Sequence, residues 1–435
     1  MATKPFHLAW FMNFTPDEWN KPFAAGGQPW TGEFYVDMAR SMERACFDYI
    51  MIEDTLMISD TYKHSSEVYL KHAIKAPQHD PAPLAALLGA STRRMGIVAT
   101  LSTLAYPPFL LARLCSTLDG MCGGRFGWNI VTSGEDLAAQ NFGLDKLPPR
   151  QQRYDMADEY VNLCLKLWGS WDQDAVILDR ETGTYTDHTK VRPINFVGKY
   201  YKCRGPLNTA PSPQGRPALI QAGGSPRGRQ FAAQNADCII APAAGVSGLK
   251  AYRDDVRARA AAAGRNPDDV KVLFLVAPVL GETEEEADAR FRRIYTSRDY
   301  IEKVLAMIGA ITDIDFSKYD LDAELPHLTT NGEQGSLDAF AQWGSGKTLR
   351  QLCIEQVSRG LDGLIGTPDQ VADRMGAVME EVGGDGFLIT RPLTTTLSRQ
   401  YILEICEGLV PALQRRELVR KAYTKDTLRE TLLEF

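Results

Sequence analysis

The chain has little that would anchor it in a membrane or cross-link it. Its 435 residues contain no apolar run of the roughly 18 residues that a transmembrane helix needs. The opening stretch, MATKPFHLAWFMNF, lacks the charged segment followed by a long apolar segment of a signal peptide, so none is expected. None of the eight cysteines forms a C-x-x-C pair, and scattered cysteines in a long chain are typical of reduced thiols. We expect a cytoplasmic protein without a membrane partner.

Several catalytic signatures are missing as well. The six histidines form no H-x-H or H-E-x-x-H pattern, which argues against a metal-dependent hydrolase, and we predict no metal site. No G-x-S-x-G occurs, and GGSPRG does not match the dinucleotide fingerprint G-x-G-x-x-G. WGSGKTLR resembles a P-loop, but Ala341 stands where that motif needs glycine, so we expect Thr348 to cap a helix instead.

The net charge indicates the kind of partner, and the length indicates how many domains to expect. Lys plus Arg is 48 and Asp plus Glu is 55, which gives a net charge of −7. This mild acidity argues against nucleic-acid binding and favours a small-molecule partner. The length suggests either two or three domains or one elaborated (β/α)8 barrel, which can absorb more than about 400 residues.

What the sequence does contain is a regular alternation of apolar runs and amphipathic helices. Buried parallel strands have this pattern, and eight such units favour a closed (β/α)8 TIM barrel over an open sheet. We therefore predict a single α/β barrel over 1–435, with two long insertions at about 169–216 and 295–346 that roof a site. The charged tail, about 415–435, is expected to be helical, as a solvated face or a dimer arm. The predicted strands are His7–Asn13, Tyr49–Asp54, Met95–Thr103, Arg125–Ser133, Ala218–Gly224, Cys238–Ala243, Val270–Leu280 and Gly386–Thr390.

The stretch ALIQAGGSPRGRQFA is typical of a strand, a tight turn and a helix start. Ser225 suits the N-cap and Pro226 the first helical position. The glycines before them allow close approach to the backbone, and free N–H groups at a helix N-terminus favour an anion such as phosphate. An ordinary strand-to-helix turn remains the alternative from this stretch alone.

Several stretches occur in an order that resembles one family. They are FDYIMIED (47–54), STLDGMCGGRFGWNIVTS (116–133), NFGLDKLPPRQQRYDMADEY (141–160), LCLKLWGSWD (163–172), the segment from NFVGKYY to RQFAA (195–233) and GTPDQVADRM (366–375). Together they are similar to the bacterial-luciferase-like flavin monooxygenases, in the branch of the nitrilotriacetate, dibenzothiophene-sulfone and long-chain alkane monooxygenases. The resemblance covers nearly the whole chain and is densest between Ser116 and Ala233.

The resemblance implies a barrel that uses FMN, as FMNH2 supplied by a separate NAD(P)H:FMN reductase, with O2 as co-substrate. It implies oxygenation of a small organic substrate through a C4a-(hydro)peroxyflavin, and a homodimer or homotetramer. It assigns flavin contacts to Asp54, Thr100, Arg150, Tyr154, Gly224 and Ser225. Asn129 and Ser133, at the end of the fourth strand, are the candidate catalytic residues, with Thr132 beside them.

The chain also departs from this family. Arg150 stands where relatives have histidine, and arginine can still pair with phosphate. Histidines are also absent from the first loop, NFTPDEWNKPF, from the position of Gly134 and from the region of Met307. The departures place any carried-over general base in doubt and indicate a different substrate. Trp10, Met12 and Trp128 are candidates for apolar walls of the site, with ordinary core packing as the alternative.

Three other functions stay open at this point. A non-catalytic flavin binder, a deazaflavin-dependent oxidoreductase and a metal-dependent hydrolase all use barrels of this kind. The missing histidines favour the first of these, whereas the insertions and RQQRYD speak against the second.

Overall fold

The protein is built around a closed barrel of eight parallel strands, as predicted. In the computed structural model, residues 4–12, 31–242, 245–357, 361, 363–392 and 397–435 are described. Going around the barrel, the order is β1-β14-β11-β10-β9-β4-β3-β2. The strands are β1 (His7–Met12), β2 (Tyr49–Ile52), β3 (Gly96–Ser102), β4 (Phe126–Val131), β9 (Ala218–Ala222), β10 (Cys238–Pro242), β11 (Lys271–Val276) and β14 (Gly386–Ile389).

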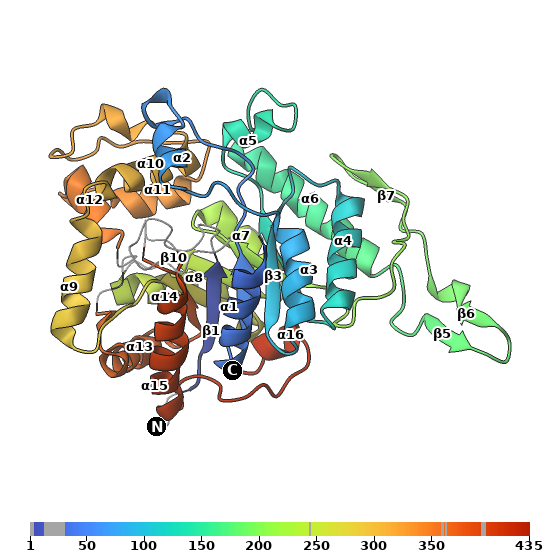
Figure 1. The fold of residues 1–435 in the computed structure, drawn as a ribbon. Coiled ribbons are helices and arrows are strands. Elements are labelled where there is room, and N and C mark those ends of the chain that lie inside the picture. Colours follow the sequence, from blue (N-terminus) through green and yellow to red (C-terminus); the bar gives the residue numbers. More distant parts are fainter. Residues whose placement is uncertain (1–3, 13–30, 243–244, 358–360, 362, 393–396) are drawn as a thin grey trace.

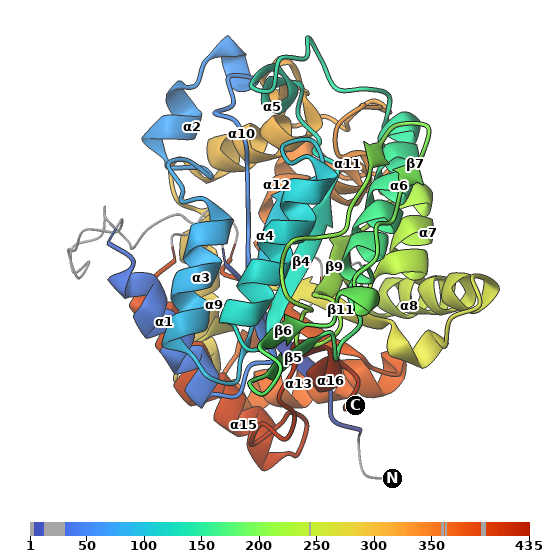
Figure 2. The ribbon, with the colours of Figure 1, turned by 90° about the vertical axis from the view of Figure 1, so that its right-hand side faces the viewer.

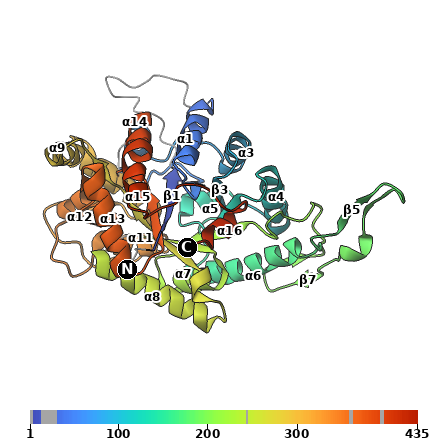
Figure 3. The ribbon, with the colours of Figure 1, turned by 90° about the horizontal axis from the view of Figure 1, so that it is seen from below.

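Helices ring the barrel on the outside, which is best seen from below in Figure 3. They bury the outer face of the strands, and packed side chains fill the barrel inside, so the strand segments are nearly continuous apolar runs. The ring consists of α1 (Glu33–Arg44), α3 (Pro81–Ser91), α4 (Pro108–Met121), α6 (Arg150–Trp168), α7 (Pro226–Asn235), α8 (Gly245–Ala262), α13 (Pro368–Val382), and α14 (Arg399–Leu403) continuing through a π-helical segment (Glu404–Leu409) into α15 (Val410–Arg415).

The two faces of the barrel strands have different environments. Alternate side chains either point between the strands and the helices or fill the barrel interior. Trp10, Met12 and Trp128 belong to the outer layer with the helices, and both tryptophans are fully buried. They are therefore core residues that do not line the site, and the alternative that we kept for them is the right one.

A second layer of helices lies over one end of the barrel (Figures 1 and 2). Its apolar side chains form a separate small core that includes Tyr300, Leu337 and Phe340, with Met307 packed against it. Thr348 caps α12 with a reciprocal bond to Gln351, as predicted. The elements are α2 (Glu67–Lys71), α5 (Asp136–Gln140), α10 (Tyr300–Thr312), α11 (Gln334–Ala341) and α12 (Leu349–Glu355), with α9 (Glu284–Tyr295) alongside the barrel.

The first insertion forms two antiparallel hairpins outside the barrel. They are β5 (Val176–Asp179) with β6 (Thr184–Thr186), and β7 (Phe196–Val197) with β8 (Lys202–Cys203). Figure 1 shows the β5–β6 hairpin extending away from the barrel, whereas the β7–β8 hairpin lies beside α6, where Glu159 accepts hydrogen bonds from the N–H groups of residues 199–201. A further short parallel pair joins β12 (Val279–Leu280) to β13 (Ile365–Gly366). Of the two insertions, only the second lies over the barrel end.

The C-terminal tail closes the opposite end of the barrel. After α15 ends at Arg415, only α16 (Leu428–Leu432) is helical, so the prediction of a helical tail is corrected. Leu428 and Leu432 join the apolar cluster inside the barrel, and this burial replaces the solvated face that we expected. The sequence pattern gave no sign of it, because charged residues surround these two leucines. No helix among the described residues combines the length and the apolar character needed to cross a membrane.

Candidate functional site

A cavity of about 310 Å³ opens at the carboxyl ends of the strands. Active sites of (β/α)8 barrels are built at this end, from the loops that follow the strands. Its walls come from β4 and the residues after it, from the turn after β9, from the start of α6 and from the start of α11. Six of the eight site residues named from the sequence line it: Asp54, Ser133, Arg150, Tyr154, Gly224 and Ser225.

One end of the cavity is suited to an anion. Ser225 is the N-cap of α7, and its side chain accepts a hydrogen bond from the Gly228 N–H at 3.1 Å, as predicted. A Cβ added to Gly224 would lie 3.3 Å from the Cα atom of Gly335, in the first turn of α11. The glycines therefore allow two helix N-termini to meet at one wall. Both helices direct the positive end of their dipole toward the same place.

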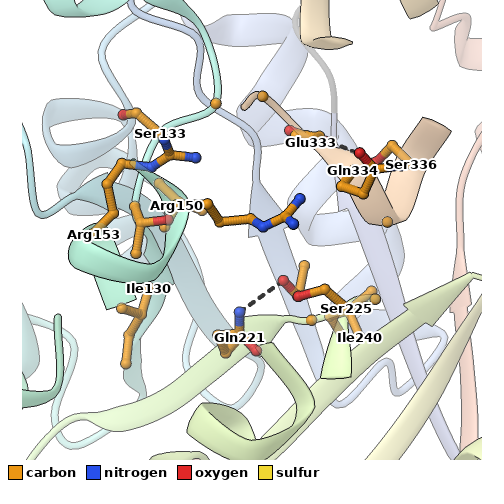
Figure 4. A pocket seen from close by; sticks show the side chains of 18 of the residues that line it. Ile130, Ser133, Arg150, Arg153, Gln221, Ser225, Ile240, Glu333, Gln334 and Ser336 are labelled. Atoms are coloured by element: carbon orange, nitrogen blue, oxygen red, sulfur yellow. Dashed lines mark hydrogen bonds between the residues drawn. The ribbon is translucent and has the colours of Figure 1, made fainter. Parts of the chain in front are cut away.

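Arg150 extends its guanidinium toward this anion end (Figure 4). It is the first residue of α6, and its backbone N–H donates to Asn331 Oδ1 at 2.9 Å. Its Nη1 is buried and has no hydrogen-bond partner among the described residues. A buried donor without a partner costs free energy unless a ligand satisfies it. The side chain thus has the charge and the free donor that a phosphate group requires.

Tyr154 lies one turn further along α6, against the start of α7. A Cβ added to Gly228 would come within 2.8 Å of its hydroxyl oxygen, so glycine is needed there. Burial raises the pKa of Tyr154, and a hydrogen bond with Ser225 partly offsets this. The hydroxyl is therefore a neutral donor beside the Ser225 cap. Its ring packs on Phe231, with Arg227 above it.

The acidic residue at the end of the second strand lies on another wall. Asp54 accepts a hydrogen bond from the Gln78 amide at 2.9 Å. Burial, followed by the negative charge of Asp80, raises the pKa of Asp54 to about 7. It can therefore gain or lose a proton near neutral pH, and the cause is desolvation inside the cavity.

Thr100 and Asn129 occupy a different position from the one expected. They are register partners on β3 and β4, and the Asn129 amide donates to Thr100 Oγ1 at 2.9 Å. Both are buried, and neither is among the residues that line the cavity. The Asn129 amide nitrogen has its partner in Thr100, whereas the Asn129 Oδ1 is buried without a partner among the described residues. A contact between either of them and a flavin or a substrate stays a prediction.

Ser133 has a strained backbone at the cavity wall. Its φ is 58°, an uncommon value for a residue with a side chain, and such residues cluster at functional sites. Its hydroxyl is 2.6 Å from that of Ser102 at the end of β3. The pair fixes the direction in which the chain leaves β4. Thr132 also lines the cavity.

Sequence reasoning missed several cavity residues. The largest omissions are two carboxylates, Glu135 and Glu333, and a second arginine, Arg153, whose guanidinium donates to the carbonyls of Pro148 and Asn331 at 2.8 and 2.7 Å. The position of Glu135, just after a strand that ends at the site, was a signal that could have been used. Glu333 comes from the second insertion, where no motif marked it.

None of the histidines among the described residues lines this cavity. His72 forms a half-buried group with Asp299 and Glu302, whose candidate ligand atoms lie within 4.8 Å of one another. Groups of this kind are common without an ion, so we assign no metal to it. The first loop, NFTPDEWNKPF, lies outside the described residues.

Comparison with known proteins identifies the family. The family model described as luciferase-like monooxygenase matches residues 19–386. The chain is 36% identical over 419 residues to dimethyl-sulfide monooxygenase of Hyphomicrobium sulfonivorans, covering 95% of this chain and 86% of the relative. It is 37% identical over 407 residues to long-chain alkane monooxygenase of Geobacillus thermodenitrificans (strain NG80-2), covering 92% and 86%.

A solved structure agrees with this placement. A crystal structure of riboflavin lyase with modified FMN and riboflavin superposes with a TM-score of 0.89 at 32% identity, over 99% of this chain and 96% of that one. The chain therefore belongs to the luciferase-like monooxygenase family. It is a flavin-dependent monooxygenase.

The raised pKa of Asp54 leads to a first prediction, on stability. In the unfolded chain an aspartate titrates near 3.9, so between about pH 4 and 7 the folded protein holds the extra proton. Stability therefore falls as pH rises through this window. We expect Asp54→Asn, which cannot ionise, to be more stable than the wild type at pH 8 by about 1–3 kcal/mol, and nearly equal at pH 4.

Urea unfolding at the two pH values measures this difference. The exposed Asp60→Asn is the matched control and should track the wild type at both. If the gap between Asp54→Asn and the wild type does not depend on pH, the assignment of a high pKa to Asp54 is wrong.

Proposed function

We propose that this enzyme uses reduced FMN to insert one atom of O2 into a small organic substrate. The observation that carries the proposal is the anion end of the cavity, where the unpartnered Arg150 guanidinium faces the N-terminus of α7. These groups fit the phosphate of FMN in charge and in hydrogen-bond donors. When bound, the reduced flavin supplies the two electrons with which O2 is activated.

The residues of the chain would divide the remaining tasks. Arg150, Ser225 and the first N–H groups of α7 would hold the phosphate, with the Tyr154 hydroxyl beside them. Gly224 would let the backbone approach it. The cavity walls would exclude water, and Ser133 and Thr132 would orient the substrate. In this way the protein contributes positioning and a dry environment.

The proposal includes partners. Reduced FMN would come from a separate NAD(P)H:FMN reductase in the cytoplasm, and the chain would assemble as a homodimer or homotetramer. Dimethyl sulfide and long-chain alkanes, which the names of two relatives contain, are the first substrates to test.

The experiment combines the purified protein with a general flavin reductase, NADH, FMN and 18O2. Each candidate substrate is then analysed for one atom of 18O in the product. We expect label in the product only when FMN, reductase and protein are all present. Failure of the protein to bind reduced FMN would overturn the proposal.

The same experiment separates the alternatives. A non-catalytic flavin carrier would bind reduced FMN and yield no labelled product with any substrate. A deazaflavin-dependent oxidoreductase would act when a reduced deazaflavin replaces FMN, and without O2.

A further inference from the structure

The helix that carries Arg150 and Tyr154 begins without a side-chain cap of its own. The N-cap position of α6 is occupied by Pro149, whose side chain has no hydrogen-bond acceptor. The first N–H groups of a helix have no partner within the helix, and a nearby side chain commonly supplies one. Here the partner is Asn331, which lies 181 positions further along the chain, in the second insertion. Its Oδ1 accepts from the Arg150 N–H at 2.9 Å, so the insertion caps α6 from a distant part of the chain.

Asn331 makes further hydrogen bonds with the same short segment. Its Nδ2 donates to the carbonyls of Leu147 and Pro148 at 3.4 and 3.3 Å. Its own carbonyl accepts from Arg153 Nη2 at 2.7 Å, and Arg153 Nη1 donates to the Pro148 carbonyl at 2.8 Å. One residue of the second insertion thus holds both the approach to α6 and its first turn.

The insertion in turn fixes the position of Asn331. The Thr330 hydroxyl donates to the Thr312 carbonyl at the end of α10, and it accepts from the Gly332 N–H at 2.9 Å. A Cβ added to Gly332 would lie only 2.7 Å from the Gly134 carbonyl oxygen, so glycine is needed for this close approach to the turn after β4. Asn331 is therefore held from both sides before it reaches α6.

The second insertion has other attachments to the barrel end. The Asp136 N–H donates to Asp313 Oδ2 at 3.2 Å, and a Cβ added to Gly335 would lie 3.1 Å from the Cα atom of Gly224. Asn331 is exposed, so replacing it opens no cavity in the core. We therefore expect loss of the Asn331 side chain to leave the fold intact and to loosen the first turn of α6.

We propose that Asn331 is a positioning residue for the phosphate of reduced FMN, and that it raises selectivity for FMN over riboflavin. The proposal rests on the proposed function. Asn331 is not among the residues that line the cavity, so it acts through Arg150, whose guanidinium extends toward the anion end (Figure 4). A first turn that is already ordered loses less conformational entropy when the phosphate binds, and binding is tighter for that reason.

The first test compares two flavins. Anaerobic fluorescence titration measures the affinity of the wild type and of Asn331→Ala for reduced FMN and for reduced riboflavin, which lacks the phosphate. We expect Asn331→Ala to bind FMN about 3- to 10-fold more weakly and riboflavin equally well. The ratio of the two affinities does not change if some of the variant is unfolded. An equal loss for both flavins, or no loss for FMN, would overturn the proposal.

Asn266→Ala is the matched control for this variant. Asn266 is also an exposed asparagine that caps a helical turn, since its side chain accepts from the Asp268 N–H at 3.2 Å at the start of the short helix Pro267–Asp269. It precedes β11 and therefore lies at the end of the barrel opposite the cavity. We expect Asn266→Ala to bind both flavins like the wild type.

The second test asks whether Asn331 acts through Arg150. The titration with reduced FMN is repeated for Arg150→Ala and for the double variant, because residues in contact have non-additive effects when one acts through the other. We expect Asn331→Ala to lower the affinity for FMN by less than about twofold when Arg150 is already alanine. A loss as large as in the wild-type background would show that Asn331 acts by another route, and the proposal would then be wrong.

The two proposals fail in different ways. If the wild type binds reduced FMN no better than reduced riboflavin, the phosphate site of the proposed function falls, and the role of Asn331 falls with it. If the wild type prefers FMN and Arg150→Ala lowers that preference while Asn331→Ala does not, only the role of Asn331 is overturned.

Discussion

Replacing Arg150 with alanine is expected to weaken binding of reduced FMN by about 10- to 100-fold. A hydrogen bond to a charged group contributes roughly 1.5–3 kcal/mol, and each 1.4 kcal/mol is about tenfold in affinity. The Arg150 Nη1 donor is buried and has no partner among the described residues. Its hydrogen bond to the phosphate therefore replaces no internal bond, and the alanine variant loses that bond in full. Anaerobic fluorescence titration with reduced FMN measures the change.

Matched variants make this result specific to the phosphate. Arg150→Lys keeps the charge and loses the fork of donors, so we expect an intermediate affinity. Arg180→Ala, an exposed arginine on the β5–β6 hairpin, should bind FMN like the wild type. Affinity for riboflavin, which lacks the phosphate, should be the same in Arg150→Ala and in the wild type. An equal loss for both flavins would contradict the assignment.

Arg420→Ala is expected to lower the free energy of unfolding by about 3–5 kcal/mol. Arg420 and Asp48 are 3% and 1% exposed, and they meet at the end of the barrel that the C-terminal tail closes. The Arg420 Nε donates to Asp48 at 2.9 Å and Nη1 donates to Glu434 at 2.6 Å. Removing the cation leaves the buried Asp48 without its main partner; the Leu8 N–H, which donates to it at 2.7 Å, and His7 at 3.3 Å remain beside it.

Arg415→Ala is the control for this change. Arg415 pairs with Asp369, and both are about 60% exposed, so we expect a loss of less than about 1 kcal/mol. Chemical denaturation followed by circular dichroism compares the two. A loss of similar size in both variants would show that the tail does not stabilise the barrel in this way.

Much of the fold could be predicted because barrel strands are buried on both faces. Each of the eight barrel strands lies inside the apolar run predicted for it, since parallel strands covered by helices leave such runs. The caps at Ser225 and Thr348 were predictable for a related reason, because a helix start depends on a few adjacent residues. Local rules and the strand pattern thus sufficed for the architecture.

The rest depended on contacts between distant segments. Leu428 and Leu432 fill the barrel from a charged tail, and no local pattern distinguishes that from a surface helix. Thr100 and Asn129 bond to each other across two strands, which a linear motif cannot show. Glu135 and Glu333 line the same cavity only because the second insertion folds over the barrel. A resemblance to a family indicates which residues match its motifs. The hydrogen-bond partners of those side chains depend on how this chain packs, and a motif does not show them.

The proposed function depends most on where the phosphate of FMN binds. A crystal structure of the protein with bound FMN tests this directly. We expect the phosphate within hydrogen-bond distance of the Arg150 guanidinium and the Ser225 hydroxyl, at the first turn of α7. A phosphate bound elsewhere, with Arg150 and Ser225 free of it, would contradict the account.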